Sequence, residues 1–164
     1  MYSIPGVDPL NPELSFSGRM VQYKYYQTGS LATGTTQLPL DNTIPQITEG
    51  DQYMSLNFQP IKVGNILEHT IIFNGASADG QVTVGYFDSS STSAIAASSD
   101  TRGASQYNTI VISFKQIVTS LDSKTFSVRA GPNSATAVTF NGASGVGYFG
   151  GTIASSIMIK EYQP

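Results

Sequence analysis

The strongest constraint on the fold of this chain is an alternation of apolar and polar side chains with a period of two residues. From Arg19 onward apolar side chains occupy every second position, first at Val21, Tyr23 and Tyr25 and later at Met54, Leu56 and Phe58. Successive side chains of a strand point to opposite faces, so this pattern predicts half-buried β-strands. Further strand-like runs cover Leu67 to Phe73, Val82 to Phe87, Ile110 to Val118, Phe126 to Ala130, Ala137 to Phe140 and Ile153 to Tyr162.

Short turn signals separate these runs. They include Asp79-Gly80, Gly131-Pro132 and Asn141-Gly142, which are dipeptides typical of tight turns. About eight strands with short connections predict two sheets packed face to face with Greek-key connections. We therefore expect an all-β fold, a jelly-roll β-sandwich, as one domain over residues 19–164. The Ala-rich stretch from Ser93 to Ser99 supports a single helical turn at most.

Composition narrows the classes of function. Charged residues make up 12% of the 164 residues, the net charge is −3, and the eight Lys and Arg are scattered singly. Contact with phosphates needs a basic patch, so we expect no nucleic-acid partner. The chain has no cysteine, so its stability must come from packing or assembly. No secretion signal and no long apolar stretch is present, so we expect no membrane insertion.

Residues 1–18 differ from the rest. Pro5, Pro9 and Pro12 each fix φ and remove a backbone donor, which favours an extended arm over a strand in a sheet. A disordered tail is the alternative. The arm carries apolar side chains that would gain by docking, so we predict that it attaches the domain to a partner through Ile4, Val7, Leu10, Leu14 and Phe16.

Few residues can support catalysis. His69 is the only histidine, and alternation places it on the same strand face as Leu67, Ile71 and Phe73. A histidine in that setting is more often a hydrogen-bonded core residue than a ligand or base. The G-x-S-x-G turn of a nucleophilic serine is missing from the sequence.

The carboxylates also give no strong site. Glu49 and Asp51 flank Gly50 and form the closest acidic pair, but neighbours at this spacing are usually solvated turn residues. One histidine cannot form a His-rich metal site, and the glycine-rich segment matches no phosphate-binding loop. We therefore predict a non-enzymatic protein with no cofactor and no metal.

A glycine-rich segment near the end of the chain surrounds two large aromatic residues. Five glycines between positions 142 and 151 flank Tyr148 and Phe149. One interpretation is a hairpin that folds both rings into its own core. The other is an aromatic contact at a trimer interface, because Tyr and Phe are enriched where subunits meet.

Three segments, TTQLPLDNTIPQITEGDQYMSLNF, FSVRAGPNSATAVTFNG and GYFGGTIASSIMIKEY, resemble a domain found in virion proteins of tailed bacteriophages. That domain is similar to the trimeric jelly-roll heads of the tumour necrosis factor and complement type. The resemblance covers most of the chain, from about Val21 to Glu161. It implies a homotrimer on the surface of a virus particle, made in the host cytoplasm.

The resemblance leaves the position on the particle open. Domains of this kind usually follow a longer fibre shaft, whereas here only a short Pro-rich arm precedes the domain. We therefore expect a trimer that decorates or cements the capsid, with the major capsid protein as partner. The alternative is a receptor-binding head on a tail fibre or baseplate that contacts a tail or baseplate protein and a host surface glycan or protein. A third interpretation, a polysaccharide-degrading tail enzyme, conflicts with the missing carboxylate site.

Overall fold

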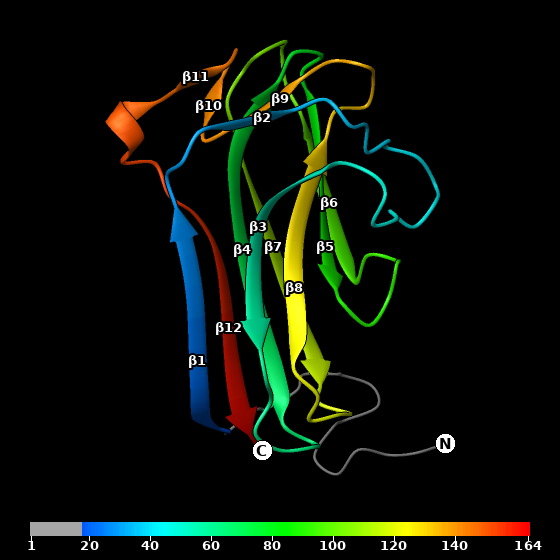
Figure 1. Ribbon diagram of the computed structural model, residues 1–164, viewed down its shortest axis with the longest axis vertical. Coiled ribbons are helices and arrows are strands. Elements are labelled where there is room, and N and C mark those ends of the chain that lie inside the picture. Colours follow the sequence, from blue (N-terminus) through cyan, green and yellow to red (C-terminus); the bar gives the residue numbers. More distant parts are fainter. Residues whose placement is uncertain (1–17) are drawn as a thin grey trace, which may run out of the picture.

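The computed structural model describes residues 18–164, so the five arm residues proposed for attachment, Ile4, Val7, Leu10, Leu14 and Phe16, lie outside the described residues. Antiparallel strands form a β-sandwich (Figure 1), which confirms the predicted all-β sandwich class. Eight strands have six residues or more: β1 Arg19–Thr28, β3 Asp51–Phe58, β4 Ile66–Ser77, β5 Gln81–Asp88, β6 Ala96–Thr101, β7 Asn108–Ile117, β8 Lys124–Gly131 and β12 Ser155–Gln163.

The remaining elements are short. They are β2 Ala32–Gly34, β9 Val138–Phe140, β10 Gly142–Ala143, β11 Val146–Gly147 and a single 3-10 turn, η1 Phe149–Gly151. β6 was not predicted, because its Ala and Ser residues carry no apolar alternation. The stretch around Ser93 to Ser99 therefore leads into a strand rather than forming a helical turn.

Two sheets pack against each other. In the first sheet, which we call the β1 sheet, the strand order is β1-β12-β4-β9-β2, and β7 also pairs with β4. The short β9 pairs with the end of β4, from Gly75 to Ser77, and β2 pairs with β9. In the second sheet, the β3 sheet, the order is β3-β8-β5-β6. Every named strand pairing is antiparallel.

The core fills the space between the two sheets. Inward-facing residues alternate along the strands as the period-two pattern requires, and the largest of them are fully buried aromatic residues such as Phe58, Phe73, Tyr86 and Phe126. Rings of Phe73 and Phe140 lie 5.2 Å apart, and those of Tyr86 and Phe126 lie 5.7 Å apart. Such aromatic pairs add to the hydrophobic free energy of the core.

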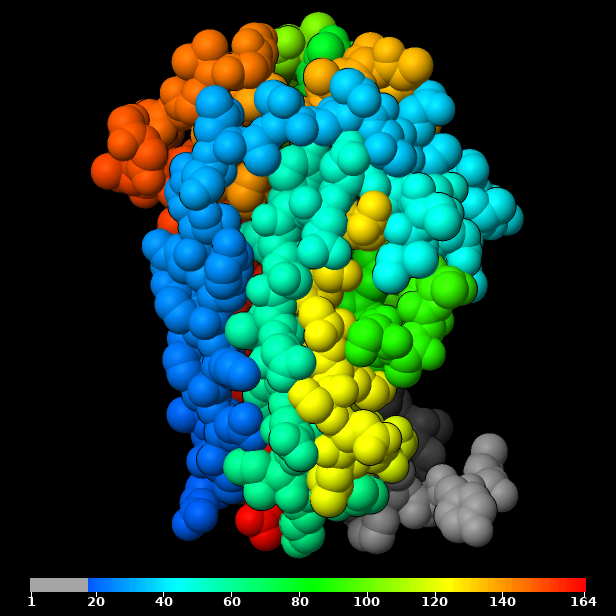
Figure 2. Space-filling model, viewed as in Figure 1, coloured from blue at the N-terminus to red at the C-terminus, as the bar shows by residue number. Residues whose placement is uncertain are grey.

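A long loop, residues 35–50, covers part of the outer face of the β3 sheet. Its Leu38 is fully buried, and its backbone lies so close to Gly131 that a Cβ there would be 2.5 Å from the Leu38 nitrogen. Arg129 of β8 holds the end of the loop, because its Nε and Nη2 donate to the carbonyls of Glu49 and Gly50 at 3.0 and 2.7 Å. Figure 2 shows this loop in cyan, lying over the upper part of the sheet.

Candidate functional site

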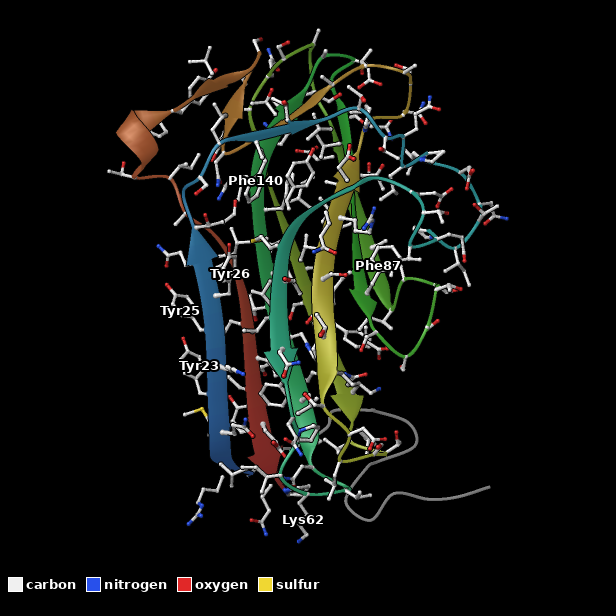
Figure 3. The ribbon with its side chains drawn as sticks, viewed as in Figure 1. Tyr23, Tyr25, Tyr26, Lys62, Phe87 and Phe140 are labelled. Carbon is white, nitrogen blue, oxygen red and sulfur yellow. The ribbon has the colours of Figure 1, made fainter. Side chains whose placement is uncertain are left out.

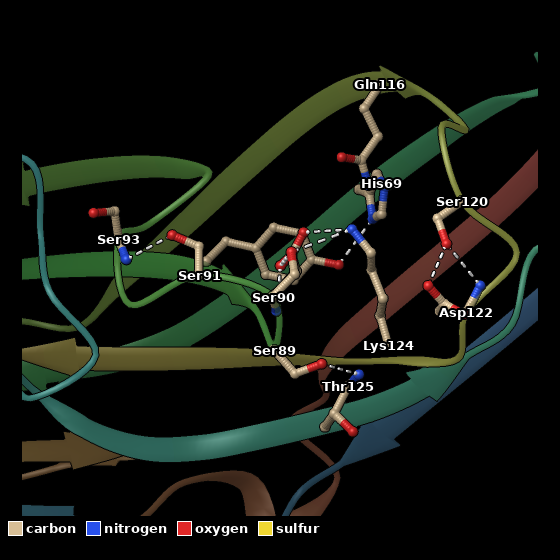
Figure 4. A network of polar contacts seen from close by, with 12 residues as sticks. His69, Ser89, Ser90, Ser91, Ser93, Gln116, Ser120, Asp122, Lys124 and Thr125 are labelled. Carbon is tan, nitrogen blue, oxygen red and sulfur yellow. Dashed lines mark hydrogen bonds and ion pairs between the residues drawn. The ribbon is translucent and has the colours of Figure 1, made fainter.

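His69 lies at the centre of a buried polar network (Figure 4). Its Nδ1 is 2.8 Å from the Tyr86 hydroxyl, and its Nε2 is 3.1 Å from the Gln116 amide nitrogen. Burial lowers the pKa of His69 from 6.5 to about 4, against a smaller opposite effect of the Asp88 charge. The ring is therefore neutral near pH 7. Both of its nitrogens are occupied by Tyr86 and Gln116, so neither contacts a serine that it could activate as a nucleophile.

A second polar network, centred on Asp88, lies next to the first. Its Oδ2 accepts from Lys124 Nζ at 3.2 Å, and its Oδ1 accepts from the backbone N–H of Ser90 at 2.7 Å. Burial would raise the pKa of Asp88, but these bonds and the Lys124 charge together lower it. The network thus ties the end of β5 to the start of β8, which is a structural role.

The two carboxylates of the closest acidic pair act separately. Glu49 Oε2 accepts from the backbone N–H of Gln46 at 2.7 Å, while Asp51 accepts from the backbone N–H and the hydroxyl of Thr36 at 2.9 and 2.8 Å. Each carboxylate therefore fixes its own part of the covering loop. This arrangement differs from an acid and a base that face one substrate.

A further carboxylate is buried among uncharged hydrogen-bond donors. Glu161 of β12 is fully buried and accepts from the backbone N–H groups of Ile61 and Lys62 at 3.0 and 3.2 Å. The side chain of Asn65 donates to it at 2.7 Å. A buried carboxylate needs such donors to replace its hydration, so Glu161 anchors the turn between β3 and β4.

Within residues 18–164 no three His, Asp or Glu side chains gather in a way that could hold a metal ion. In the same part of the chain, none of the helical structure is long and apolar enough to span a membrane.

Within residues 18–164, the outer face of the β1 sheet carries side chains that are exposed or half-buried across its four long strands. Register pairs place Tyr25, Met158, Thr70 and Ser113 in one row across β1, β12, β4 and β7. Neighbouring rows add further apolar side chains that are exposed or half-buried: Tyr23, Ile66, Ile72, Val111, Ile117 and Tyr162. We call these residues, with Tyr25 and Met158, the bare face.

Aromatic rings at the edge of the bare face lie open to solvent. Tyr23 and Tyr25 are each about half exposed, their rings stack at 6.3 Å, and both point away from the sandwich (Figure 3). An ion-paired row crosses the same face, where Glu68 lies between Lys115 at 3.2 Å and Lys160 at 3.6 Å. The face thus combines apolar side chains with hydroxyl groups and one charged row, in which two lysines share a single glutamate and leave a net positive charge.

The glycine-rich segment forms a protruding tip beside β1 (Figure 1). Phe149 is 74% exposed and has a φ of 52°, a left-handed conformation that is uncommon for a bulky residue. Tyr148 is more protected, because its ring lies 5.8 Å from that of Tyr107. Phe149 is therefore not folded into the core of its own chain, and the tip presents it outward together with Val146 and Leu31.

Tyr148 and Phe149 were predicted as candidate contact residues, whereas the bare face was not predicted. A signal for it exists in three apolar runs, Tyr25-Tyr26, Ile71-Ile72-Phe73 and Ile157-Met158-Ile159. Such runs put apolar side chains on both faces of a strand, which means that the outer face also needs cover. The period-two alternation identifies only the residues that face the core, so it did not predict the apolar outer face.

Comparison with known proteins gives no assignment: a scan against protein-family models finds no match, and a search of curated proteins finds none either.

Proposed function

We propose that the chain is a non-enzymatic structural protein that works as a homotrimer, with the bare face as the contact between subunits. The observation that carries this proposal is the apolar outer face of the β1 sheet. Four strands of about ten residues present roughly 20 Å by 30 Å, about 600 Å². The apolar side chains of the bare face take up part of this area, on the scale of the exposed apolar patches that mark interaction sites, and the tip with Phe149 adds further apolar surface. A standard interface buries about 800 Å² of each partner.

The order of the strands supports the same proposal. Among the eight long strands, the first, last, third and sixth lie together in one sheet, and the second, seventh, fourth and fifth form the other. That order fits a jelly roll of two Greek keys, the architecture that the resemblance to trimeric virion domains implies. Following that resemblance, we propose a position on the exterior of a tailed-bacteriophage virion, as a decoration or cement protein of the capsid.

Light scattering at micromolar concentration tests the trimer. We expect a mass three times the 17.4 kDa of one chain, and a stable folded monomer would refute the proposal. The double variant Tyr25→Lys, Met158→Lys adds two charges to one row of the bare face and should yield folded monomers. The matched control is Asn57→Lys, Thr125→Lys, which alters a neighbouring exposed pair of the β3 sheet and should remain trimeric.

Gold labelling of intact particles tests the position on the virion. Label over the capsid supports decoration, whereas label at the tail favours the receptor-binding alternative. A chain that starts at Arg19 tests the arm: we expect it to fold and trimerise but not to bind particles that lack the native protein. Equal binding by the truncated chain would show that the attachment surface lies in the β-sandwich and not in the arm.

A further inference from the structure

A groove lies on the other side of the molecule, between the covering loop and the edge strand β6. Its volume is about 280 Å³. One wall is the loop segment from Pro39 to Pro45, and the other wall consists of residues on β5 and β6, including Thr83, Ala97 and Ser99. The bare face belongs to the opposite sheet, so this groove stays separate from the proposed subunit contact.

The loop wall is fixed at both ends before any ligand arrives. The backbone N–H of Leu40 donates to Asn133 Oδ1 at 3.1 Å, and the carbonyl of Pro45 accepts from the N–H of Ala94 at 2.8 Å. Between them, Asp41 Oδ1 accepts from the backbone N–H and the hydroxyl of Thr43 at 2.7 and 2.6 Å. A preformed wall reduces the ordering cost of binding.

The strand wall supplies hydroxyl groups whose hydrogen bonds within the protein are weak. Ser99 Oγ accepts from Thr83 Oγ1 at 3.4 Å and from Gln81 Nε2 at 3.5 Å. Both distances lie at the long limit for hydrogen bonds. The Ser99 hydroxyl can therefore exchange these bonds for bonds to a ligand at little cost, whereas Thr83 is buried beside it.

The charge and apolar lining restrict the ligand further. Neither Lys nor Arg lines the groove, and Asp41 is its one charged side chain. The hydrogen bonds from Thr43 lower the pKa of Asp41, so its carboxylate is ionised near neutral pH and repels anions. Pro39, Leu40 and Pro45 offer apolar surface opposite the hydroxyl groups.

We propose that this groove binds a neutral saccharide segment. A sugar ring presents hydroxyl groups on its rim, which match Ser99 and Asp41, and C–H groups on its faces, which match the two prolines. A carboxylated or phosphorylated sugar would face Asp41 without a compensating cation. This site goes beyond the proposed structural function and does not depend on the trimer.

Binding of the intact protein to immobilised oligosaccharides tests the site, with neutral hexose and N-acetylhexosamine chains beside matched chains that contain uronic acids. We expect retention on neutral chains and none on acidic ones. Ala97→Trp fills the groove from an exposed position and should weaken binding at least tenfold. Asn57→Trp, an exposed residue of β3 outside the groove, is its control and should leave binding unchanged.

A second variant tests the charge argument. Asp41→Asn should allow the uronic-acid chains to bind, while binding of the neutral chains changes less than twofold. The control Asp122→Asn, in another exposed loop, should leave the binding of both kinds of chain unchanged. The proposal is wrong if no neutral chain is retained, if the wild-type protein prefers acidic chains, or if Ala97→Trp binds as well as wild type. Light scattering on the same samples shows whether a variant that no longer binds saccharides has also lost its assembly, which tells a defect of the groove from a defect of the trimer.

Discussion

The outer faces of the two sheets differ in how their apolar residues are covered. On the β3 sheet, Phe87 points away from the core side of its strand yet is fully buried, and Leu38 of the covering loop is fully buried against the same sheet. On the β1 sheet, Tyr23, Val111 and Ile117 are each more than half exposed. One face is thus partly covered by its own chain, whereas the other is exposed and, in the proposed trimer, would be covered by a second subunit. Changes to the first should affect folding, and changes to the second should affect assembly.

The largest effect is expected under the covering loop. Leu38→Ala removes a fully buried side chain and should lower the free energy of unfolding by about 2–5 kcal/mol. Leu40→Ala, in the same loop but 56% exposed, should change it by less than about 0.5 kcal/mol. Urea unfolding of both variants measures the difference, and equal losses would show that the loop does not cover the sheet as described.

Acid should weaken the core that both sheets share. The pKa of His69 is about 4 in the folded chain and 6.5 in the unfolded reference, so the unfolded state binds more protons between these values. Stability should therefore fall as the pH drops from 6.5 to 4, by at most about 3 kcal/mol. His69→Gln should be less stable at pH 7 but show a flatter dependence over this window. Identical pH slopes in the two proteins would contradict this account.

A smaller effect on the free energy of unfolding is expected for changes in β12, whose two faces have different roles. Glu161→Gln on the inner face keeps the shape but weakens the bonds from Ile61 and Lys62, so unfolding should become easier by about 1–3 kcal/mol. Its neighbour Lys160 lies on the bare face with Glu68. Lys160→Gln should leave the unfolding of one subunit nearly unchanged. Thermal unfolding in the monomeric background of the Tyr25→Lys, Met158→Lys variant makes this comparison without a contribution from assembly.

The smallest change in folding is expected at the edge of the bare face. Tyr23→Ser removes a half-exposed ring and should alter the stability of a single subunit by less than about 0.5 kcal/mol. The same substitution should raise the dissociation constant of the trimer measurably in sedimentation experiments. If neither Tyr23→Ser nor the double lysine variant weakens the trimer, the subunit contact must lie on another surface.

The strands were largely predictable because their apolar residues repeat every second position. Each predicted run corresponds to a strand, including the short β9, and His69 takes the predicted place beside Ile71 on the inner face. β6 escaped prediction because a strand of Ala, Ser and Asp has no apolar face to recognise. The covering loop could not be foreseen either, since the contacts of Leu38 with Gly131 and of Arg129 with Gly50 join positions about 80 to 90 residues apart. Local periodicity contains no information about such contacts.

The pairing of the first and last strands has a practical consequence. β1 and β12 are neighbours along their full length, with Arg19 opposite Gln163, and both of these ends lie at the same pole of the sandwich (Figure 1). Paired residues in adjacent strands are separated by only about 5 Å, so a short glycine linker could join the two ends. A circular permutant opened between β6 and β7 would then retain every strand pairing, and foreign peptides inserted there would be displayed far from the original termini.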